Sequence, residues 1–307
     1  MGIWIDTDMG FDDIAAVLVV RHAGMVIDGM SLVAGNVPMD QVRRNAAGAC
    51  AAFGWSFPIH CGRSFPVLGP VETARRILGQ TGMRTVGQAL PDVITLPDGN
   101  AFVALCDWLS GDDPEPRRIL ALGPLGNIAA LVLARPDLAA KISDLVWMGG
   151  AVGAGNHTAS AEFNALADPE ALSIILAHGV PLRMVDLDLC RQVLVTLQDA
   201  ETIRVCGGRN AGLLADLLAG YVMIALERGR PAMGLYDPCA AVALATADIV
   251  HFQPAHIAVE LQGSHTRGRT IVDARPATVP NAQYAVAVDA DRARDFVLDA
   301  LRKEAGQ

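Results

Sequence analysis

The sequence lacks the features that mark several common protein classes. It contains no run of about 18 uncharged apolar residues, so we expect no transmembrane helix. Basic residues are not in surplus: 24 Lys and Arg stand against 33 Asp and Glu, and the net charge of −9 argues against nucleic acid or an anionic membrane as the partner. The first predicted strand begins at Gly2 and is followed by Asp6 and Asp8, so we expect no targeting segment.

Cysteine and histidine offer little to build a site from. The 6 cysteines contain no C-x-x-C pair, so we interpret them as reduced core residues and expect a cytoplasmic protein. The 7 histidines show no metal-ligand spacing. The G-x-S-x-G, Walker A and G-x-G-x-x-G patterns are also absent. Their absence argues against a serine hydrolase, an NTPase and a dinucleotide-binding enzyme.

What the sequence does contain is a regular alternation of short and long apolar segments. With 307 residues and 52% apolar residues, the chain is long enough for a large core. The short segments predict strands at Gly2–Ile5, Met30–Val33, Pro58–Cys61, Ile119–Leu122, Leu145–Met148, Leu182–Val185, Ile257–Leu261 and Tyr284–Val288. The long ones predict helices at Asp12–Arg21, Asp40–Ala52, Asn100–Leu109, Asn127–Ala134, Pro169–Ala177, Gly212–Glu227, Pro238–Ala245 and Arg292–Arg302.

This alternation predicts an α/β fold with a mostly parallel central sheet and helices on both faces. We expect one domain over residues 1–307, with the ligand at the carboxyl ends of the strands. Two segments, at about 62–97 and 221–236, are predicted to be loop or cap regions over that site.

Four carboxylates crowd the end of the first predicted strand, at Asp6, Asp8, Asp12 and Asp13. One Asp is explained by capping of the next helix, but four are not. Like charges this close repel one another unless a cation or a polyhydroxylated ligand lies between them. Asp8 and Asp13, on either side of Gly10, are placed to reach one hard metal ion. A phosphoryl-transfer enzyme with an N-terminal Asp-x-Asp is the main alternative.

A second polar cluster lies near the middle of the chain. Asn156, Glu162 and Asn164 offer hydrogen-bonding groups suited to sugar hydroxyls, because an amide both donates and accepts. Asp168 and Asp237 each precede a proline and a predicted helix. Taken alone, each is better explained as a helix N-cap than as a site residue.

Taken together, these motifs resemble the inosine–uridine-preferring nucleoside hydrolase family. The first motif, D-x-D-x-G-x-D-D, is the most specific, and the resemblance covers nearly the whole chain in the family's order. The matching segments are Asp6 to Asp13, Gly35-Asn36, Val42 to Ala46, Gly123 to Asn127, Met148 to Gly150, Ala161 to Asn164, Asp168 to Ala171, Asp237-Pro238 and Gly268 to Asp273.

The resemblance implies a Rossmann-like nucleoside hydrolase fold and an enzyme that cleaves the N-glycosidic bond of ribonucleosides. It implies one Ca²⁺ bound by Asp8, Asp13, Asp237 and the main-chain carbonyl of Leu122. Asp237, which looked like a cap, then becomes a metal ligand. A nucleoside would be the small-molecule partner. Because members of the family tend to form dimers or tetramers, the resemblance also implies a homodimer or homotetramer.

The resemblance also assigns the ribose contacts. Asp12 and Asn36 would hold the 2′-hydroxyl, Asn164 the 3′-hydroxyl, and Asn156 with Glu162 the 5′-hydroxyl. The remaining predicted substrate contacts are Met148, Phe163 and Tyr236. Bond cleavage passes through an oxocarbenium-like ribosyl cation, which nearby carboxylates stabilise. Ca²⁺ would chelate the diol and acidify a water, and Asp8 would accept the proton of that water as general base.

The sequence departs from the family on the side of the leaving base. Many members carry a His before the late Asp and another in an H-G-x-x-G loop, and these positions are Tyr236 and Leu78 here. Tyrosine is a weak acid near neutrality. Three consequences are open: stacking of a purine on Tyr221, Tyr236, Trp55 or Trp108, acceptance of a different base, or a slow or non-catalytic relative.

Two other functions therefore stand beside the nucleoside hydrolase. A Mg²⁺-dependent phosphohydrolase would need a Lys or Arg near the phosphoryl group, and the loops around Asp8, Asn127 and Glu162 contain neither. A non-catalytic riboside-binding protein would keep the diol-binding residues and lose the acid. Identity of the base, the oligomeric state and the pathway are beyond what these motifs specify.

Overall fold

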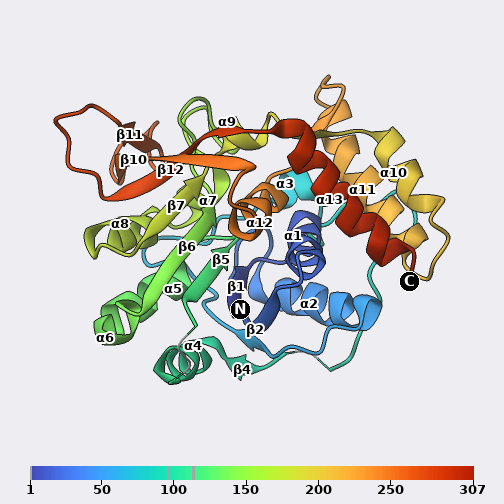
Figure 1. Cartoon of the computed structure of the whole chain (residues 1–307), viewed down its shortest axis with the longest axis horizontal. Helices are drawn as coiled ribbons and strands as arrows, with labels where there is room; N and C mark the ends of the chain where they lie inside the picture. The colour runs from blue at the N-terminus through green and yellow to red at the C-terminus, as the bar shows by residue number, and fades with distance from the viewer. Residues whose placement is uncertain (1, 96, 113–114) are drawn as a thin grey trace.

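A central β-sheet organises the chain in the computed structural model, which describes residues 2–95, 97–112 and 115–307 (Figure 1). Within these residues the sheet has 10 strands in the order β11-β10-β12-β7-β6-β5-β1-β2-β3-β4. They are β1 (Gly2–Thr7), β2 (Val26–Leu32), β3 (Ile59–Cys61), β4 (Gly99–Asn100), β5 (Arg117–Ala121), β6 (Ile142–Met148), β7 (Leu182–Val185), β10 (Val250–Val259), β11 (Thr270–Asp273) and β12 (Ala282–Val288). A separate antiparallel pair joins β8 (Leu194–Val195) to β9 (Met233–Gly234).

Helices cover both faces of this sheet, as the alternating pattern predicted. They are α1 (Phe11–His22), α2 (Met39–Phe53), α3 (Arg75–Leu78), α4 (Ala101–Ser110), α5 (Gly126–Ala134), α6 (Pro136–Ala139), α7 (Phe163–Ala167), α8 (Pro169–Ala177), α9 (Leu187–Cys190), α10 (Leu197–Arg204), α11 (Ala211–Leu226), α12 (Asp237–Ala245) and α13 (Ala290–Ala305). In Figure 1, α1, α12 and α13 lie on one side of the strands, while α5, α6 and α8 gather around the β5–β7 half and α4 lies beside β4.

The central strands, such as β1 and β5, are buried on both faces, which explains their continuous apolar sequences. In β1, Ile3 and Ile5 join the core formed with α1, α2, α11, α12 and α13, whereas Trp4 joins the core formed with α4, α5, α6 and α8. In β5, likewise, Leu120 belongs to the first of these cores and its neighbour Ile119 to the second. A parallel sheet with helices on both sides buries successive side chains in opposite directions, so a continuous apolar run is required.

The position of β1 determines where a ligand can bind. Strand β1 pairs in parallel with β2 on one side and with β5 on the other. The chain therefore runs outward from β1 through β2, β3 and β4, and then returns to the opposite side at β5. Loops leave the carboxyl ends of β1 and β5 in different directions and open a crevice between them, the usual ligand site of such sheets.

The mostly parallel sheet is confirmed, and every predicted strand and helix overlaps an observed one. The sequence did not predict β11, which pairs in antiparallel fashion with β10. Strand β10 also runs antiparallel to β12, so this end of the sheet is mixed. The predicted strand Ile257–Leu261 overlaps only the last residues of the longer β10, which begins at Val250 and ends at Val259. The antiparallel strands β10 and β11 are partly exposed, so their sequences are not continuous apolar runs. The alternation of apolar strands and helices therefore could not reveal them.

The segment 62–97 consists of loops and the single turn α3, and residue 96 lies outside the described part of the chain. It is fastened at several points. Asp168 accepts from the main-chain N–H of Val67 at 3.0 Å, and Asp216 accepts from that of Gln88 at 2.6 Å. The main-chain N–H of Ala74 donates to the carbonyl of Asn36 at 3.0 Å, which couples the segment to the loop after β2.

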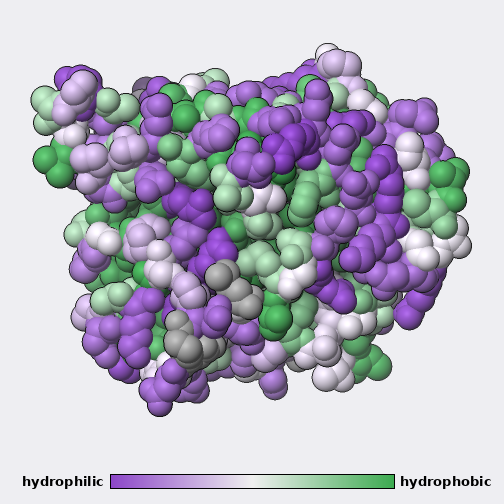
Figure 2. Space-filling view, in the orientation of Figure 1, coloured by the Kyte–Doolittle hydropathy of each residue, from purple (hydrophilic) through white to green (hydrophobic). Residues whose placement is uncertain are grey.

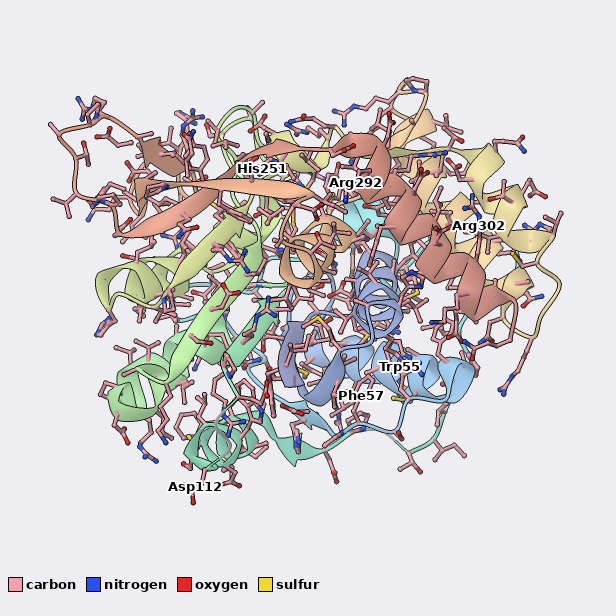
Figure 3. All side chains as sticks on the ribbon, viewed as in Figure 1. Trp55, Phe57, Asp112, His251, Arg292 and Arg302 are labelled. Carbon is pink, nitrogen blue, oxygen red and sulfur yellow. The ribbon has the colours of Figure 1, made fainter. Side chains whose placement is uncertain are left out.

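The outer surface mixes polar and apolar residues. Figure 2 shows the two kinds interspersed over the face that is turned toward the viewer in Figure 1. Figure 3 shows that Arg292 and Arg302 lie along α13 and that Trp55 and Phe57 lie beside α2. Among the residues described, none of the helices combines the length and the apolar character that a membrane crossing requires.

Candidate active site

The turn between β1 and α1 carries the acidic motif. Met9 adopts a left-handed conformation, with φ of 56°, although its side chain is completely buried. Asp13 holds the turn closed, because its carboxylate accepts from the hydroxyl of Thr7 and, at 2.7 Å, from the main-chain N–H of Gly10. An unusual backbone conformation of this kind persists where the surrounding bonds enforce it, and such residues cluster at functional sites.

The fold brings a fourth carboxylate to this turn from the far end of the chain. Asp237 is the first residue of α12, and Asp12, Asp13 and Asp237 each place a carboxylate oxygen within 4.8 Å of the other two. The N-cap of α12 is Tyr236, so Asp237 is not the helix cap that its sequence context suggested. Burial and the neighbouring negative charges raise the pKa of Asp237 far above its ordinary value, and burial raises that of Asp12 to about 7.

Asp8 lies on the side of this cluster nearest to β2. Its two carboxylate oxygens accept from Asn36, one from the main-chain N–H at 2.7 Å and one from the side-chain amide at 2.9 Å. A Cβ atom on Gly35 would lie 2.1 Å from Asp8 Oδ2, so the glycine is what allows the loop to approach. Burial and the charge of Asp13 raise the pKa of Asp8 well above its usual range.

Asp6 supports the cluster from inside the sheet. Its carboxylate accepts from the hydroxyl of Ser31 on β2 and from the side-chain amide of Asn127 at 2.7 Å. Asn127 also donates to the carbonyl of Leu32 and accepts from the main-chain N–H of Arg63. The Gly123–Asn127 motif thus ties β1, β2 and the loop after β3 together. Burial raises the pKa of Asp6 to about 7.

The ends of β5 and β6 supply the next part of the site. The side-chain amide of Asn164 donates to the main-chain carbonyls of Leu122 and Met148, both at 3.0 Å. These two bonds orient the amide so that its oxygen is free to accept from a ligand. The carbonyl of Leu122 keeps a second lone pair and remains able to serve as a ligand.

Glu162 and Asn156 complete this side. Both oxygens of Glu162 accept backbone N–H bonds, from Asn164 at 2.8 Å and from Ala165 and Gly150 at 2.9 Å. Glu162 is therefore the N-cap of α7, and burial raises its pKa to about 7 against the effect of these bonds. Asn156 accepts from the main-chain N–H of Phe163 at 2.9 Å, which leaves its NH₂ group available.

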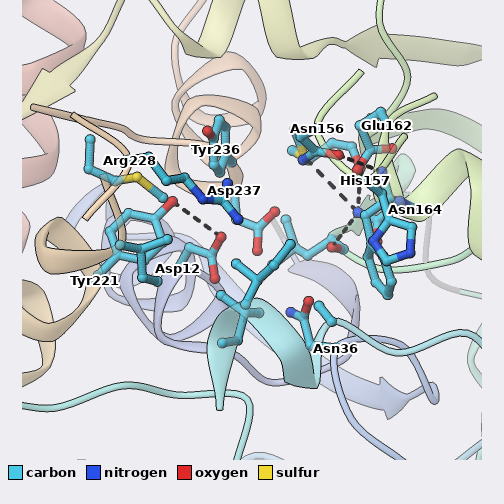
Figure 4. Close-up of a pocket in the computed structure, with 18 residues that line it drawn as sticks. Asp12, Asn36, Asn156, His157, Glu162, Asn164, Tyr221, Arg228, Tyr236 and Asp237 are labelled. Carbon is cyan, nitrogen blue, oxygen red and sulfur yellow. Dashed lines mark hydrogen bonds between the residues drawn. The ribbon is translucent and has the colours of Figure 1, made fainter. Parts of the chain in front are cut away.

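These groups open into a cavity that is continuous with solvent. It is lined by Asp12, Asn36, Ala74, Ile77, Leu78, Leu122, Met148, Asn156, His157, Glu162, Phe163, Asn164, Tyr221, Ile224, Arg228, Met233, Tyr236 and Asp237. Figure 4 shows two chemically different sides, with Tyr221, Arg228 and Tyr236 facing Asn156, Glu162 and Asn164 across Asp12 and Asp237.

The structure brings together the predicted metal ligands and the predicted substrate contacts, in two layers. Each of the predicted substrate contacts lines the cavity, as do Leu122 and Asp237. Asp8 and Asp13 lie behind this lining and are 1% and 0% exposed. Asp8 is not in the closest group of three carboxylates, where Asp12 stands in its place. Asp168 does cap α8, as the sequence predicted, and accepts from the main-chain N–H of Ala171.

Two of the aromatic candidates lie elsewhere. Trp55 packs between Phe53 and Phe57, and Trp108 packs against Trp4. Neither lines the cavity, whereas Tyr221 and Tyr236 do. Trp55 is buried just after α2, and Trp108 is half-buried near the end of α4. Their sequence positions carried no information about which end of the sheet they would face.

Sequence reasoning predicted caps near 62–97 and 221–236 and named Leu78 and Tyr221, but it missed other cavity residues from α3, from the end of α11 and from the segment after α11. Ile77, Ile224 and Met233 form apolar walls, and Arg228 reaches the mouth. The loops next to the acidic motif contain no Lys or Arg, but the fold brings Arg228 to it from a distant segment. Nothing in the sequence around Arg228 distinguishes it from other exposed arginines.

The chain thus has a mostly parallel α/β fold in which an acidic cluster that could hold a metal ion lies at the carboxyl ends of the strands, beside a cavity lined by amides. The comparisons with known proteins give the family. The model of the family described as inosine-uridine preferring nucleoside hydrolase matches residues 3–295. The chain belongs to this family, and it is a nucleoside N-glycosyl hydrolase, as the sequence predicted.

Individual relatives agree with this result. The chain is 34% identical over 301 residues to the non-specific ribonucleoside hydrolase RihC of Salmonella schwarzengrund (strain CVM19633), covering 97% of this chain and 96% of the relative. The structure of a purine-preferring ribonucleoside hydrolase from Gardnerella vaginalis is similar, with 27% identity, a TM-score of 0.91 and coverage of 100% and 99% of the two chains. The plant nucleoside hydrolase PpNRh1 has 26% identity, a TM-score of 0.89 and coverage of 98% of each chain.

Proposed function

We propose that this protein hydrolyses ribonucleosides to ribose and free base, with Asp8 as general base and one Ca²⁺ in the acidic cluster. The observation that carries the proposal is the pairing of that cluster with a cavity lined by Asn36, Asn156, Glu162 and Asn164. Amide and carboxylate groups in this number can hydrogen-bond the hydroxyls of a polyhydroxylated ring, whereas the carboxylates would repel an anionic phosphate. This argument, together with the family, disfavours a Mg²⁺-dependent phosphohydrolase.

The donor set fits a hard cation. Asp12, Asp13 and Asp237 hold oxygens within 4.8 Å of one another, a spacing that ligands of one Ca²⁺ share when each is about 2.4 Å from the ion. We assign Asp8, Asp13, Asp237 and the carbonyl of Leu122 as the residues that would hold it. When bound, Ca²⁺ would supply Lewis-acid chemistry, orienting the ribose diol and acidifying a water.

The remaining steps belong to the side chains. Asp12 and Asn36 would receive the 2′-hydroxyl, and the free amide oxygen of Asn164 would accept from the 3′-hydroxyl. Asn156 would donate its unused N–H to the 5′-hydroxyl beside Glu162. Held in this way, C1′ develops positive charge above a floor of carboxylates, which stabilises the oxocarbenium-like transition state. Phe163 and Met148 would pack against the sugar and exclude water.

Asp8 is proposed to accept the proton of the attacking water. Its two bonds from Asn36 fix its carboxylate, and its burial beside Asp13 makes it more basic than an exposed Asp. We expect Asp8→Ala to fold normally and to lose turnover by about 10²–10⁴-fold, the range for a positioned base. Release of ribose from uridine and inosine measures this, with the exposed Asp40→Ala as control. A folded Asp8→Ala enzyme with normal turnover would contradict the assignment.

A non-catalytic riboside-binding protein is separated by the same assay. Such a protein would bind ribose-containing ligands in calorimetry and release no ribose from any nucleoside. We further propose that residues 1–307 act as one domain, that the segments near 62–97 and 221–236 cap the site, and that the protein is a cytoplasmic homodimer or homotetramer. All 6 cysteines are free thiols, which supports a reducing compartment. Light scattering coupled to size-exclusion chromatography tests the assembly.

A further inference from the structure

The antiparallel end of the sheet brings one buried hydroxyl to the turn after β6. Thr270 is the first residue of β11, which lies at the edge of the sheet beside β10 (Figure 1), and only 2% of the residue is exposed. The motif Gly268–Asp273, which the structure describes in full, lies outside the lining of the cavity. Any contribution of this motif to the site therefore passes through the residues that Thr270 contacts.

The Thr270 hydroxyl forms two hydrogen bonds with a single residue. It donates to the main-chain carbonyl of Ala151 at 2.7 Å and accepts from the main-chain N–H of Ala151 at 2.8 Å. A hydroxyl can do both because its oxygen carries one donor proton and two lone pairs. Ala151 is 1% exposed, so an apolar residue at position 270 would take the partner from a buried N–H and from a buried carbonyl. The hydroxyl therefore fixes the backbone of Ala151.

Gly150 carries this constraint toward the site. It adopts a left-handed conformation, with φ of 76°, and a Cβ atom there would lie 3.0 Å from Thr270 Oγ1. The Gly150–Ala151 turn therefore packs directly on Thr270. The main-chain N–H of Gly150 donates to Glu162 Oε2 at 2.9 Å, and Glu162 lines the cavity beside Asn156 (Figure 4). A shift of the turn would therefore displace the carboxylate of Glu162.

The loop before β11 is itself held in place, so Thr270 is a fixed support for the turn. Arg267 donates to both carboxylate oxygens of Glu170 on α8, each at 2.8 Å. Gly268 has φ of 78°, and a Cβ atom there would lie 2.5 Å from the Cα atom of Leu166 on α7. The loop thus packs against α7 and α8, and the Thr270 hydroxyl is held relative to the same helices as the sugar side of the site.

We propose that Thr270 is a positioning residue for the nucleoside 5′-hydroxyl, because it holds the Gly150–Ala151 turn against Glu162. This role rests on the proposed hydrolase function, which assigns Glu162 and Asn156 to that hydroxyl. Thr270 itself does not touch the substrate. A binding group must lie within about 0.5 Å of its productive position, and the hydrogen bonds of the residues behind it provide that precision. The antiparallel extension of the sheet thereby supports the sugar side of the site.

The test compares Thr270→Val, which removes the hydroxyl, with Thr270→Ser, which keeps it. Thr278→Val is the matched control, because the Thr278 hydroxyl bonds Asp273 on the same extension and Thr278 lies outside the cavity lining. Substrates are uridine, inosine and their 5′-deoxy counterparts, which have no hydroxyl for Glu162 to bind. In Thr270→Val we expect kcat/KM to fall about 10- to 100-fold on uridine and inosine, and at least about fivefold less on the 5′-deoxy nucleosides. Thr270→Ser and Thr278→Val should keep most of the wild-type rate.

Three results would overturn the role of Thr270: normal kcat/KM of Thr270→Val on uridine and inosine, an equal loss on the 5′-deoxy nucleosides, or an equal loss in Thr278→Val. Thr270→Ala, which places less bulk against Gly150, repeats the measurement without the volume of valine. Loss of the folded state in both variants, measured by circular dichroism, would make Thr270 a structural residue and would also overturn the proposal. Failure of the wild-type enzyme on every nucleoside would instead overturn the hydrolase function itself, and this role with it.

Discussion

Asn36 donates its main-chain N–H to one carboxylate oxygen of Asp8 at 2.7 Å and its side-chain amide to the other at 2.9 Å. Asn36, in the loop after β2, thereby determines the position of Asp8, which follows β1. The two loops meet because β1 and β2 are parallel neighbours whose carboxyl ends lie at the same edge of the sheet. The pair therefore links the fold directly to the proposed general base.

Asn36→Ala should lower kcat/KM by about 10- to 100-fold, because small losses of alignment in a catalytic group are costly. The main-chain bond to Asp8 remains, so the variant should keep its fold. Asn281→Ala is the matched control, since the Asn281 side chain bonds the backbone of Ile257 far from the cavity. The control should lose stability and keep its kcat. Normal kinetics in Asn36→Ala would show that the main-chain bond alone positions Asp8.

Calcium should raise the thermal stability of the wild-type protein. Four buried carboxylates repel one another without a cation, and binding at 100 times Kd contributes about 2.7 kcal/mol to the free energy of unfolding. In the presence of EDTA, Asp237→Asn should melt at a higher temperature than the wild type, because it removes one of the repelling charges. It should also lose most of the calcium effect. Differential scanning calorimetry with and without calcium measures both.

The control for this experiment is Asp273→Asn, which removes a half-buried acid that is paired with Arg275. It should leave the stabilisation by calcium unchanged. If calcium shifts the melting temperature of Asp237→Asn as much as that of the wild type, the cation binds elsewhere.

Gly35→Ala should disrupt the site more than the fold. The added Cβ would lie 2.1 Å from Asp8 Oδ2, so either the carboxylate or the loop must move. We expect kcat to fall by at least about tenfold, as for other displaced catalytic groups. Gly306→Ala is the control, because a Cβ there meets its nearest neighbour at an ordinary 3.4 Å. Equal activity of the two variants would show that the loop adapts freely.

Asp186 should make stability depend on pH in a defined direction. It caps α9 through bonds from the main-chain N–H groups of Asp188 and Leu189, and burial raises its pKa to about 6. The folded state then holds this proton more tightly than the unfolded chain, whose pKa is about 3.9. The stabilisation is complete below pH 4 and is lost as the pH rises through 6.

Asp186→Asn keeps the accepting oxygen of the cap and removes the titration. Relative to this variant, the wild type should lose up to about 3 kcal/mol of unfolding free energy between pH 4 and pH 7. Denaturant unfolding of both proteins across this range measures the difference. A difference that does not change with pH would mean that Asp186 titrates normally.

The sequence predicted most of the site because its residues follow strands. Asp8, Asn36, Leu122 and Met148 lie at or shortly after the ends of β1, β2, β5 and β6, so the parallel pattern alone places them at one edge. Asp237 was recognised as a site residue through the family resemblance, because a lone Asp before Pro is usually a cap. Its true position became visible where α12 packs against α1 and delivers the carboxylate to Asp13.

Arg228, Ile77 and Met233 could not be predicted in this way. Arg228 follows α11, Ile77 lies in the single turn α3, and Met233 lies in the two-residue strand β9. Segments this short show no periodic pattern of apolar residues from which they could be predicted. Their positions depend on contacts between distant segments, such as the bond of Ala74 to Asn36 and the pairing of Arg84 with Glu227. The prediction that Trp55 or Trp108 stacks on the base was wrong for the same reason: the direction of a side chain depends on tertiary packing, and neither residue lines the cavity.

The sequence by itself determined the α/β fold, the family, and the acidic and amide groups of the sugar side, because these depend on local order along successive strands. The tertiary structure decided which carboxylates lie within reach of one ion and which arginine lines the cavity. Those relationships join residues more than a hundred positions apart, and only the packing of α11 and α12 against the crevice beside β1 brings them together.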